Sequence, residues 1–111
     1  MSLLAIDTCL AACQAAVISD GVALASLSEP MARGHQERLG PMVREAMDQA
    51  GLRFSELDRI AVTVGPGSFT GLRVGLAFAK GLALALDIPC TGVGTLAALA
   101  AGAAGRRAAV I

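Results

Sequence analysis

The segment of residues 59–87 constrains the fold more than any other, because it predicts a strand, a turn and a helix in direct succession. Residues 60–64 (IAVTV) are mostly apolar and β-branched and show no polar alternation, which is typical of a strand covered on both faces. The glycines and proline of residues 65–67 then break the strand. Residues 72–86 are apolar except for two cations, so we expect them to form a long helix.

This long helix needs cover on nearly every side. Its only charged side chains, Arg73 and Lys80, are seven residues apart and share one narrow stripe. One side can pack on a sheet, and the rest can be covered by the same chain or by a second one; the pattern leaves both open. Small residues recur every four positions and predict a ridge that another backbone can approach, at Gly71, Gly75, Ala79 and Ala83. The uncharged run is shorter than the roughly 20 residues that a membrane span requires.

The amino-acid composition excludes several classes of protein. The 111 residues suit one domain, and 55% hydrophobic against 16% charged residues exclude disorder. Nine basic and nine acidic residues cancel, so no surface for nucleic-acid phosphates is indicated. Cys9, Cys13 and Cys90 form no close pair, which predicts reduced, packed thiols of a cytosolic protein. The N-terminus lacks a basic region before its acidic Asp7 and predicts a strand, not a signal peptide.

The N-terminal third predicts an antiparallel meander. Three strands are expected there, at residues 2–8, 11–19 and 22–28. Asp20 and Gly21 are a strong signal for a two-residue hairpin turn. Pro30 ends the third strand in a loop of residues 29–34.

An amphipathic helix follows the meander. We expect it to begin near Leu39, or at His35 with a kink at Pro41, and to stop at Gly51. Its apolar positions share one face: Leu39, Met42, Val43, Ala46, Met47 and Ala50.

A short strand at residues 90–93 and an Ala-rich helix at residues 95–104 are expected after the long helix. An apolar run then breaks off at Ile111, which suggests a piece of a longer protein. The order strand, strand, strand, helix, strand, helix, strand, helix predicts an α/β domain with a mixed five-stranded sheet, whose three N-terminal strands are antiparallel.

The sequence contains no group of residues that is typical of an enzyme active site. The GPGSFTG sequence opens a helix as anion-binding loops do, but a Walker loop needs Lys where Leu72 stands, and a dinucleotide loop needs Gly at Thr70. Asp7 and Thr8 end the first strand and are weak candidates for holding a phosphate or magnesium ion; a polar strand end is the alternative. His35, the only histidine, cannot form a multi-His metal site. We therefore expect no catalytic residue and no metal site.

Three motifs resemble the TsaB (YeaZ) family: IDTC (residues 6–9), GHQERLGPMV (34–43) and, most specifically, GPGSFTGLRVGLAFAKGLA (65–83). The family belongs to the bacterial machinery that makes N6-threonylcarbamoyladenosine at position 37 of tRNAs reading ANN codons. The resemblance implies the actin-like ATPase (ASKHA) fold, a duplicated RNase H-like domain. Because TsaB proteins are longer, residues 1–111 are expected to be the N-terminal domain, with the C-terminal domain absent.

The resemblance implies a partner subunit without a catalytic site or cofactor of its own. The catalytic paralogue, TsaD, carries an HxxxH metal motif after the strand equivalent to residues 90–93, where this sequence has Thr95 and Leu99. Asp7 matches the first phosphate-hairpin carboxylate, but ASKHA nucleotide sites lie between two domains. The implied partners are a TsaD-like catalytic subunit and a TsaE-like ATPase, with a homodimer in isolation, only indirect contact with tRNA, no membrane and a cytoplasmic location.

Two helices are expected to form the partner surface. The segments of residues 35–50 and 70–86 would lie side by side on one sheet face and meet the same pair of another subunit as a four-helix bundle. The expected interface residues are His35, Leu39, Met42, Leu72, Arg73, Gly75, Leu76, Ala79 and Lys80. Two alternatives stay open: an ATP-binding or ATP-hydrolysing enzyme of the actin-like group, and a glycoprotease-like (M22) metallopeptidase.

Overall fold

The structure is a computed structural model of the chain, and it describes residues 1–8, 12–30, 35–64 and 69–93. The elements are β1 (Ser2–Asp7), β2 (Ala12–Ser19), β3 (Val22–Pro30), α1 (His35–Ala50), the 3-10 turn η1 (Phe54–Glu56), β4 (Arg59–Thr63), α2 (Phe69–Leu86) and β5 (Cys90–Val93). This order agrees with the predicted one up to the last strand. The expected helix of residues 95–104, the GPGS turn and the C-terminal run lie outside the described residues.

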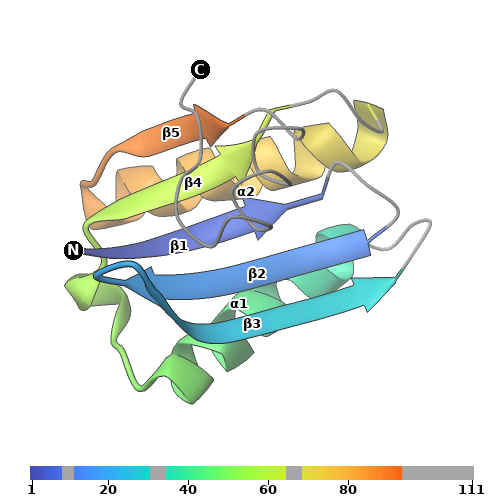
Figure 1. The fold of residues 1–111 in the computed structure, drawn as a ribbon. Helices are drawn as coiled ribbons and strands as arrows, with labels where there is room; N and C mark the ends of the chain where they lie inside the picture. The colour runs from blue at the N-terminus through green and yellow to red at the C-terminus, as the bar shows by residue number, and fades with distance from the viewer. Residues whose placement is uncertain (9–11, 31–34, 65–68, 94–111) are drawn as a thin grey trace.

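The five strands form one mixed sheet in the order β3-β2-β1-β4-β5 (Figure 1). The β1–β2 and β2–β3 pairs are antiparallel, whereas β1–β4 and β4–β5 are parallel. Both helices lie on the same face of this sheet, α1 over β2 and β3, and α2 over β4 and β1. The predicted mixed sheet, with its antiparallel N-terminal half, is confirmed.

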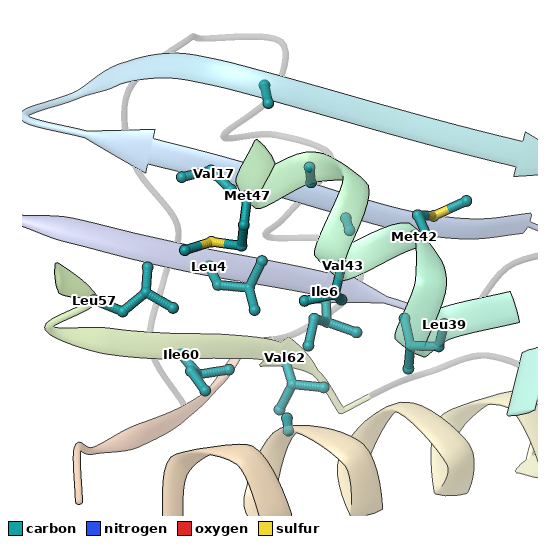
Figure 2. Packing of buried hydrophobic residues seen from close by; sticks show 14 of the residues in the cluster. Leu4, Ile6, Val17, Leu39, Met42, Val43, Met47, Leu57, Ile60 and Val62 are labelled. Carbon is teal, nitrogen blue, oxygen red and sulfur yellow. The ribbon is translucent and has the colours of Figure 1, made fainter. Parts of the chain in front are cut away.

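The core fills the space between the sheet and the two helices. Leu4 and Ile6 of β1 and Ile60 and Val62 of β4 are fully buried on the helix-facing side (Figure 2). The predicted apolar face of α1 meets them, with five fully buried side chains: Leu39, Met42, Val43, Ala46 and Met47. The 3.6-residue period therefore predicted the buried face of α1 correctly.

The strand ends agree with local sequence signals in most places. Asp20 and Gly21 have φ angles of 51° and 80°, the positive values that a type I′ hairpin turn requires, so the predicted turn is confirmed. β3 continues to Pro30, two residues beyond the predicted strand end at residue 28. Pro30 is tolerated there because it is the last residue of β3, an edge strand, and proline in sheets occurs mainly on edge strands.

Both helices end in the same hydrogen-bonded motif. Gly51 (φ 71°) donates to the Asp48 carbonyl and Leu52 to the Met47 carbonyl after α1. After α2, Asp87 (φ 57°) and Ile88 repeat this pattern onto Leu84 and Ala83. Each is a Schellman motif, in which a residue in the left-handed region lets the chain reverse and satisfies the last carbonyls.

Candidate partner-binding surface

Asp7 and Thr8, the weak candidates for cofactor binding, have structural contacts at the end of β1. The Asp7 carboxylate accepts a hydrogen bond of 2.8 Å from the Thr63 hydroxyl. Thr8 is fully buried and packs against Gly75 of α2, where a Cβ atom would lie 2.3 Å from the Thr8 Oγ1. The two neighbouring side chains thus tie β1 to β4 and to α2. The expectation that no cofactor binds here, with Asp7 and Thr8 only as weak candidates, stays a prediction.

The ridge of small residues on α2 faces the chain's own sheet. Ala79 is 0% exposed and Ala83 is 4% exposed, and both belong to the core cluster. Gly75 is also buried, beneath Thr8. At these three positions the chain itself covers the ridge, which is one of the two kinds of cover that the sequence pattern left open. The close approach that small side chains permit is used by β1 and β4 instead.

A second stripe of α2 points outward. It consists of side chains that are all exposed: Arg73, Ala77, Lys80, Gly81, Leu84 and Ala85. Leu84 is 84% exposed, more than any other large hydrophobic side chain of the described residues. A Cβ atom built on Gly81 would meet nothing within 4 Å. This stripe is apolar at its centre, which is unusual for a helix face in contact with water alone.

The outward side of α1 is polar and adjoins this stripe. Its exposed residues are Glu37, Pro41, Arg44, Glu45, Asp48 and Gln49. The two helices touch where the Phe78 ring of α2 lies 3.9 Å from the Cβ position of Gly40 in α1. Arg38 binds Glu29 of β3 and, at 3.4 Å, Glu45, which fastens the outer border of α1 to the edge strand. The exposed sides of α1 and α2 form one continuous surface, called here the helix face.

The structure divides the predicted interface residues into two groups. Leu39, Met42, Gly75 and Ala79 are enclosed by the chain itself and present no surface. Arg73 and Lys80 are exposed on the helix face, and Leu76 is half-buried at its border. The side chains of His35 and Leu72 lie outside the described ones.

Sequence reasoning missed the apolar centre of the helix face, at Ala77, Gly81 and Leu84. A signal was present: these three residues lie on the same side of the helix as Arg73 and Lys80, the charged positions that mark the side turned to water.

The two cysteines among the described residues are free thiols. Burial raises the pKa of Cys13 and also that of Cys90, and the positive charge of Lys80 opposes the rise at Cys90. Among the described residues, no three His, Cys, Asp or Glu side chains come together in a group that could bind a metal ion. No helix in the described ranges has both the length and the apolar character needed to span a bilayer.

The sheet order and the helix placement define an RNase H-like domain of the ASKHA class. A solved structure of YeaZ from Pseudomonas aeruginosa superposes with a TM-score of 0.85 at 46% identity, covering 92% of this chain and 47% of that one. The family model described as "TsaD: tRNA N6-adenosine threonylcarbamoyltransferase" matches residues 27–110. The chain belongs to this family, and within it to the TsaB (YeaZ) group.

Relatives carry names from both branches of the family. The Escherichia coli "tRNA threonylcarbamoyladenosine biosynthesis protein TsaB" is 42% identical over 103 residues, which are 93% of this chain and 44% of that protein. A "tRNA N6-adenosine threonylcarbamoyltransferase" from Trichlorobacter lovleyi is 40% identical over 109 residues, covering 84% of this chain and 32% of that protein. The chain spans about half the length of the TsaB proteins it matches.

Proposed function

We propose that this chain is the N-terminal domain of a non-catalytic subunit in the bacterial machinery for tRNA N6-threonylcarbamoyladenosine, and that it works by holding a TsaD-like catalytic subunit through the helix face. The observation that carries the proposal is the apolar centre of that face, where Leu84 is 84% exposed. Exposed apolar centres bordered by polar residues are typical of protein interfaces. The names of the relatives supply the pathway.

A scaffolding role is favoured over a reaction at the end of β1. The Asp7 carboxylate is engaged by Thr63, and Thr8 is enclosed beneath α2. Thr95 and Leu99 stand where the resemblance puts the metal-binding histidines of the catalytic subunit. The threonylcarbamoyl transfer would then take place on the partner, with a TsaE-like ATPase in the same complex and tRNA held by the other subunits.

The partner itself is expected to present a similar surface. Relatives named as the transferase are 38–40% identical to most of this chain, so they share its helices. Two subunits with the same fold can meet through equivalent helix pairs in a pseudo-symmetric bundle. This supports a helix-to-helix contact over the alternative of an edge-strand contact at β3.

Leu84→Glu tests this proposal. The change places a charge at the centre of the helix face, and it leaves the fold intact because the side chain is 84% exposed. Losing the burial of one leucine at an interface costs about 1.5–3 kcal/mol, so affinity for the purified catalytic subunit should fall at least about tenfold. Isothermal titration calorimetry measures the affinity, and a tRNA-modification assay measures the loss of threonylcarbamoyladenosine formation that should follow.

Val22→Glu is the matched control, because Val22 is also a large exposed hydrophobic residue, at 60%, but lies on the edge strand β3. Wild-type affinity is expected for this variant. Failure of the unaltered chain to bind the catalytic subunit would refute the proposed function. Equal affinity of Leu84→Glu and wild type would refute the proposed location of the interface.

A further inference from the structure

Arg59, the first residue of β4, points away from the two helices. Its neighbours Ile60 and Val62 are buried on the helix side, and strand side chains alternate between the two faces of a sheet. The Nη1 atom of Arg59 donates a hydrogen bond of 2.9 Å to the hydroxyl group of Thr91 in β5. This contact holds the guanidinium across β4 and β5, on the sheet face that neither α1 nor α2 covers (Figure 1).

The hydrogen bond to Thr91 satisfies the guanidinium of Arg59 only in part. Its Nε atom is buried and has no hydrogen-bond partner, and the side chain makes no other polar contact within the described residues. The bond to Thr91 leaves the edge of the guanidinium that carries Nε and Nη2, on which a carboxylate can bind with two parallel hydrogen bonds. Because a buried donor of a charged group is unfavourable without an acceptor, an oxyanion is expected at this edge.

The acidic residues of the chain do not supply this acceptor. All nine lie within the described ranges, and none of them is paired with Arg59 there. Those with partners elsewhere are Asp7 (Thr63), Asp20 (the Met1 ammonium group), Glu29 and Glu45 (Arg38), Glu56 (Arg53) and Asp58 (the Ser2 N–H). Glu37 and Asp48 lie on the outward side of α1, and Asp87 is exposed after α2. A carboxylate that pairs with Arg59 must therefore come from outside residues 1–111.

The surroundings of Arg59 suit a protein segment better than a free ion. The side chains that share its sheet face on β1, β2 and β4 are mostly small or apolar, and these are not exposed: Leu3, Ala5, Ala16, Ile18 and Ala61. Half-buried apolar side chains favour packing against another apolar layer, whereas a small anion would gain nothing from them. Arginine is the cation suited to such a site, because its weakly hydrated fork can be buried together with a carboxylate.

We propose that Arg59 binds a carboxylate from the half of the protein that the TsaB relatives have beyond the matched region, and that this ion pair fixes that half on the sheet face opposite the helix face. The match covers 44% of the Escherichia coli TsaB protein and 47% of the Pseudomonas aeruginosa YeaZ structure, so a segment of similar length remains in each to supply the acid. The inference rests on the proposed function only in treating residues 1–111 as an N-terminal domain. The two faces of the sheet would then serve two different contacts, one within the protein and one with the catalytic subunit.

Arg59→Met tests the pairing in residues 1–111 and in the full-length protein that contains them. In residues 1–111 the melting temperature should stay the same or rise, because methionine keeps the apolar stem and removes a cation whose Nε has no acceptor among the described residues. In the full-length protein it should fall by about 5 °C or more, because a buried carboxylate loses its partner. Arg59→Lys should restore only part of that loss, since an ammonium group keeps the charge but lacks the two-bond fork. Differential scanning calorimetry measures these melting temperatures.

Arg53→Met is the matched control, because Arg53 is an exposed arginine whose ion pair with Glu56 lies outside this sheet face. It should shift the melting temperature by less than about 2 °C in both proteins. A loss for Arg59→Met in the full-length protein alone supports the pairing. An equal loss in both proteins would place the acceptor within residues 1–111, and no loss in the full-length protein would show that no carboxylate is paired there; either result overturns the inference. Binding of the wild-type chain to the catalytic subunit, measured separately, decides the proposed function, so the two failures can be told apart.

Discussion

Gly75 and Gly81 are two glycines of one helix with opposite surroundings, and the difference decides what a methyl group does at each. At Gly75, a Cβ atom would lie 2.3 Å from Thr8 Oγ1, well inside van der Waals contact. At Gly81, the same atom would meet nothing within 4 Å. Gly75 is therefore required by the packing of α2 on β1, whereas Gly81 has no such internal reason.

Gly75→Ala should lower the free energy of unfolding by about 1–3 kcal/mol, because overpacking forces Thr8 or the helix to shift. Gly81→Ala, in the same helix, should instead raise it by up to about 1 kcal/mol, the difference in helix propensity. Chemical denaturation measures both. In a double-mutant cycle, Thr8→Ala should relieve part of the Gly75→Ala cost, because it removes the Oγ1 atom. Equal effects at the two glycines would contradict the packing described here.

The ends of the helices are set by local chemistry, so they were largely predictable from the sequence. Gly51 was expected to end α1, and it occupies the left-handed position of a Schellman motif. At the end of α2 the same position holds Asp87, which adopts a φ of 57° at some steric cost. The sequence signal there was Pro89, which ends the helix without showing which residue takes the left-handed conformation.

Exchanging the residue type at these two ends should change stability in opposite directions. Gly51→Ala puts a Cβ atom on a residue with φ 71° and should cost about 1 kcal/mol. Asp87→Gly removes that strain and should raise the free energy of unfolding by up to about 1 kcal/mol, reduced by the greater entropy of glycine in the unfolded chain. Thermal and urea unfolding of both variants check this. A destabilised Asp87→Gly would mean that the Asp87 side chain contributes more than its backbone strain costs.

Which side of α2 faces the sheet was harder to predict from the sequence than the presence of the helix itself. Its residues are apolar almost all round, so periodicity could not decide which small-residue stripe meets the sheet: the one containing Gly75 and Ala79, or the one containing Ala77 and Gly81. In the structure, the first of these two stripes packs against the sheet. On α1, polar residues fill the outward side, and the buried face was predicted without ambiguity. A clear period on one helix and its absence on the other explain why the buried face of α1 was predicted better than the orientation of α2.

At the scale of the whole molecule, one helix face would serve two partners: the catalytic subunit of the proposed function and the second copy that the resemblance to TsaB implies. The catalytic subunit and a second copy of the chain would both need the apolar centre around Gly81 and Leu84, which lies on the open side of the helix layer. Two partners that need the same surface bind in competition, since neither can dock while the other is in place.

Adding the catalytic subunit should therefore convert paired copies of the chain into a complex with one copy of each protein across the helix face. Native mass spectrometry and light scattering report the composition, and the apparent affinity for the catalytic subunit should weaken as the chain concentration rises and self-pairing competes. Leu84→Glu should lose both kinds of pairing, because Leu84 is 84% exposed at the apolar centre of the helix face. A complex in which two copies of the chain stay paired through α2 while the catalytic subunit is bound would show that the two partners use different surfaces.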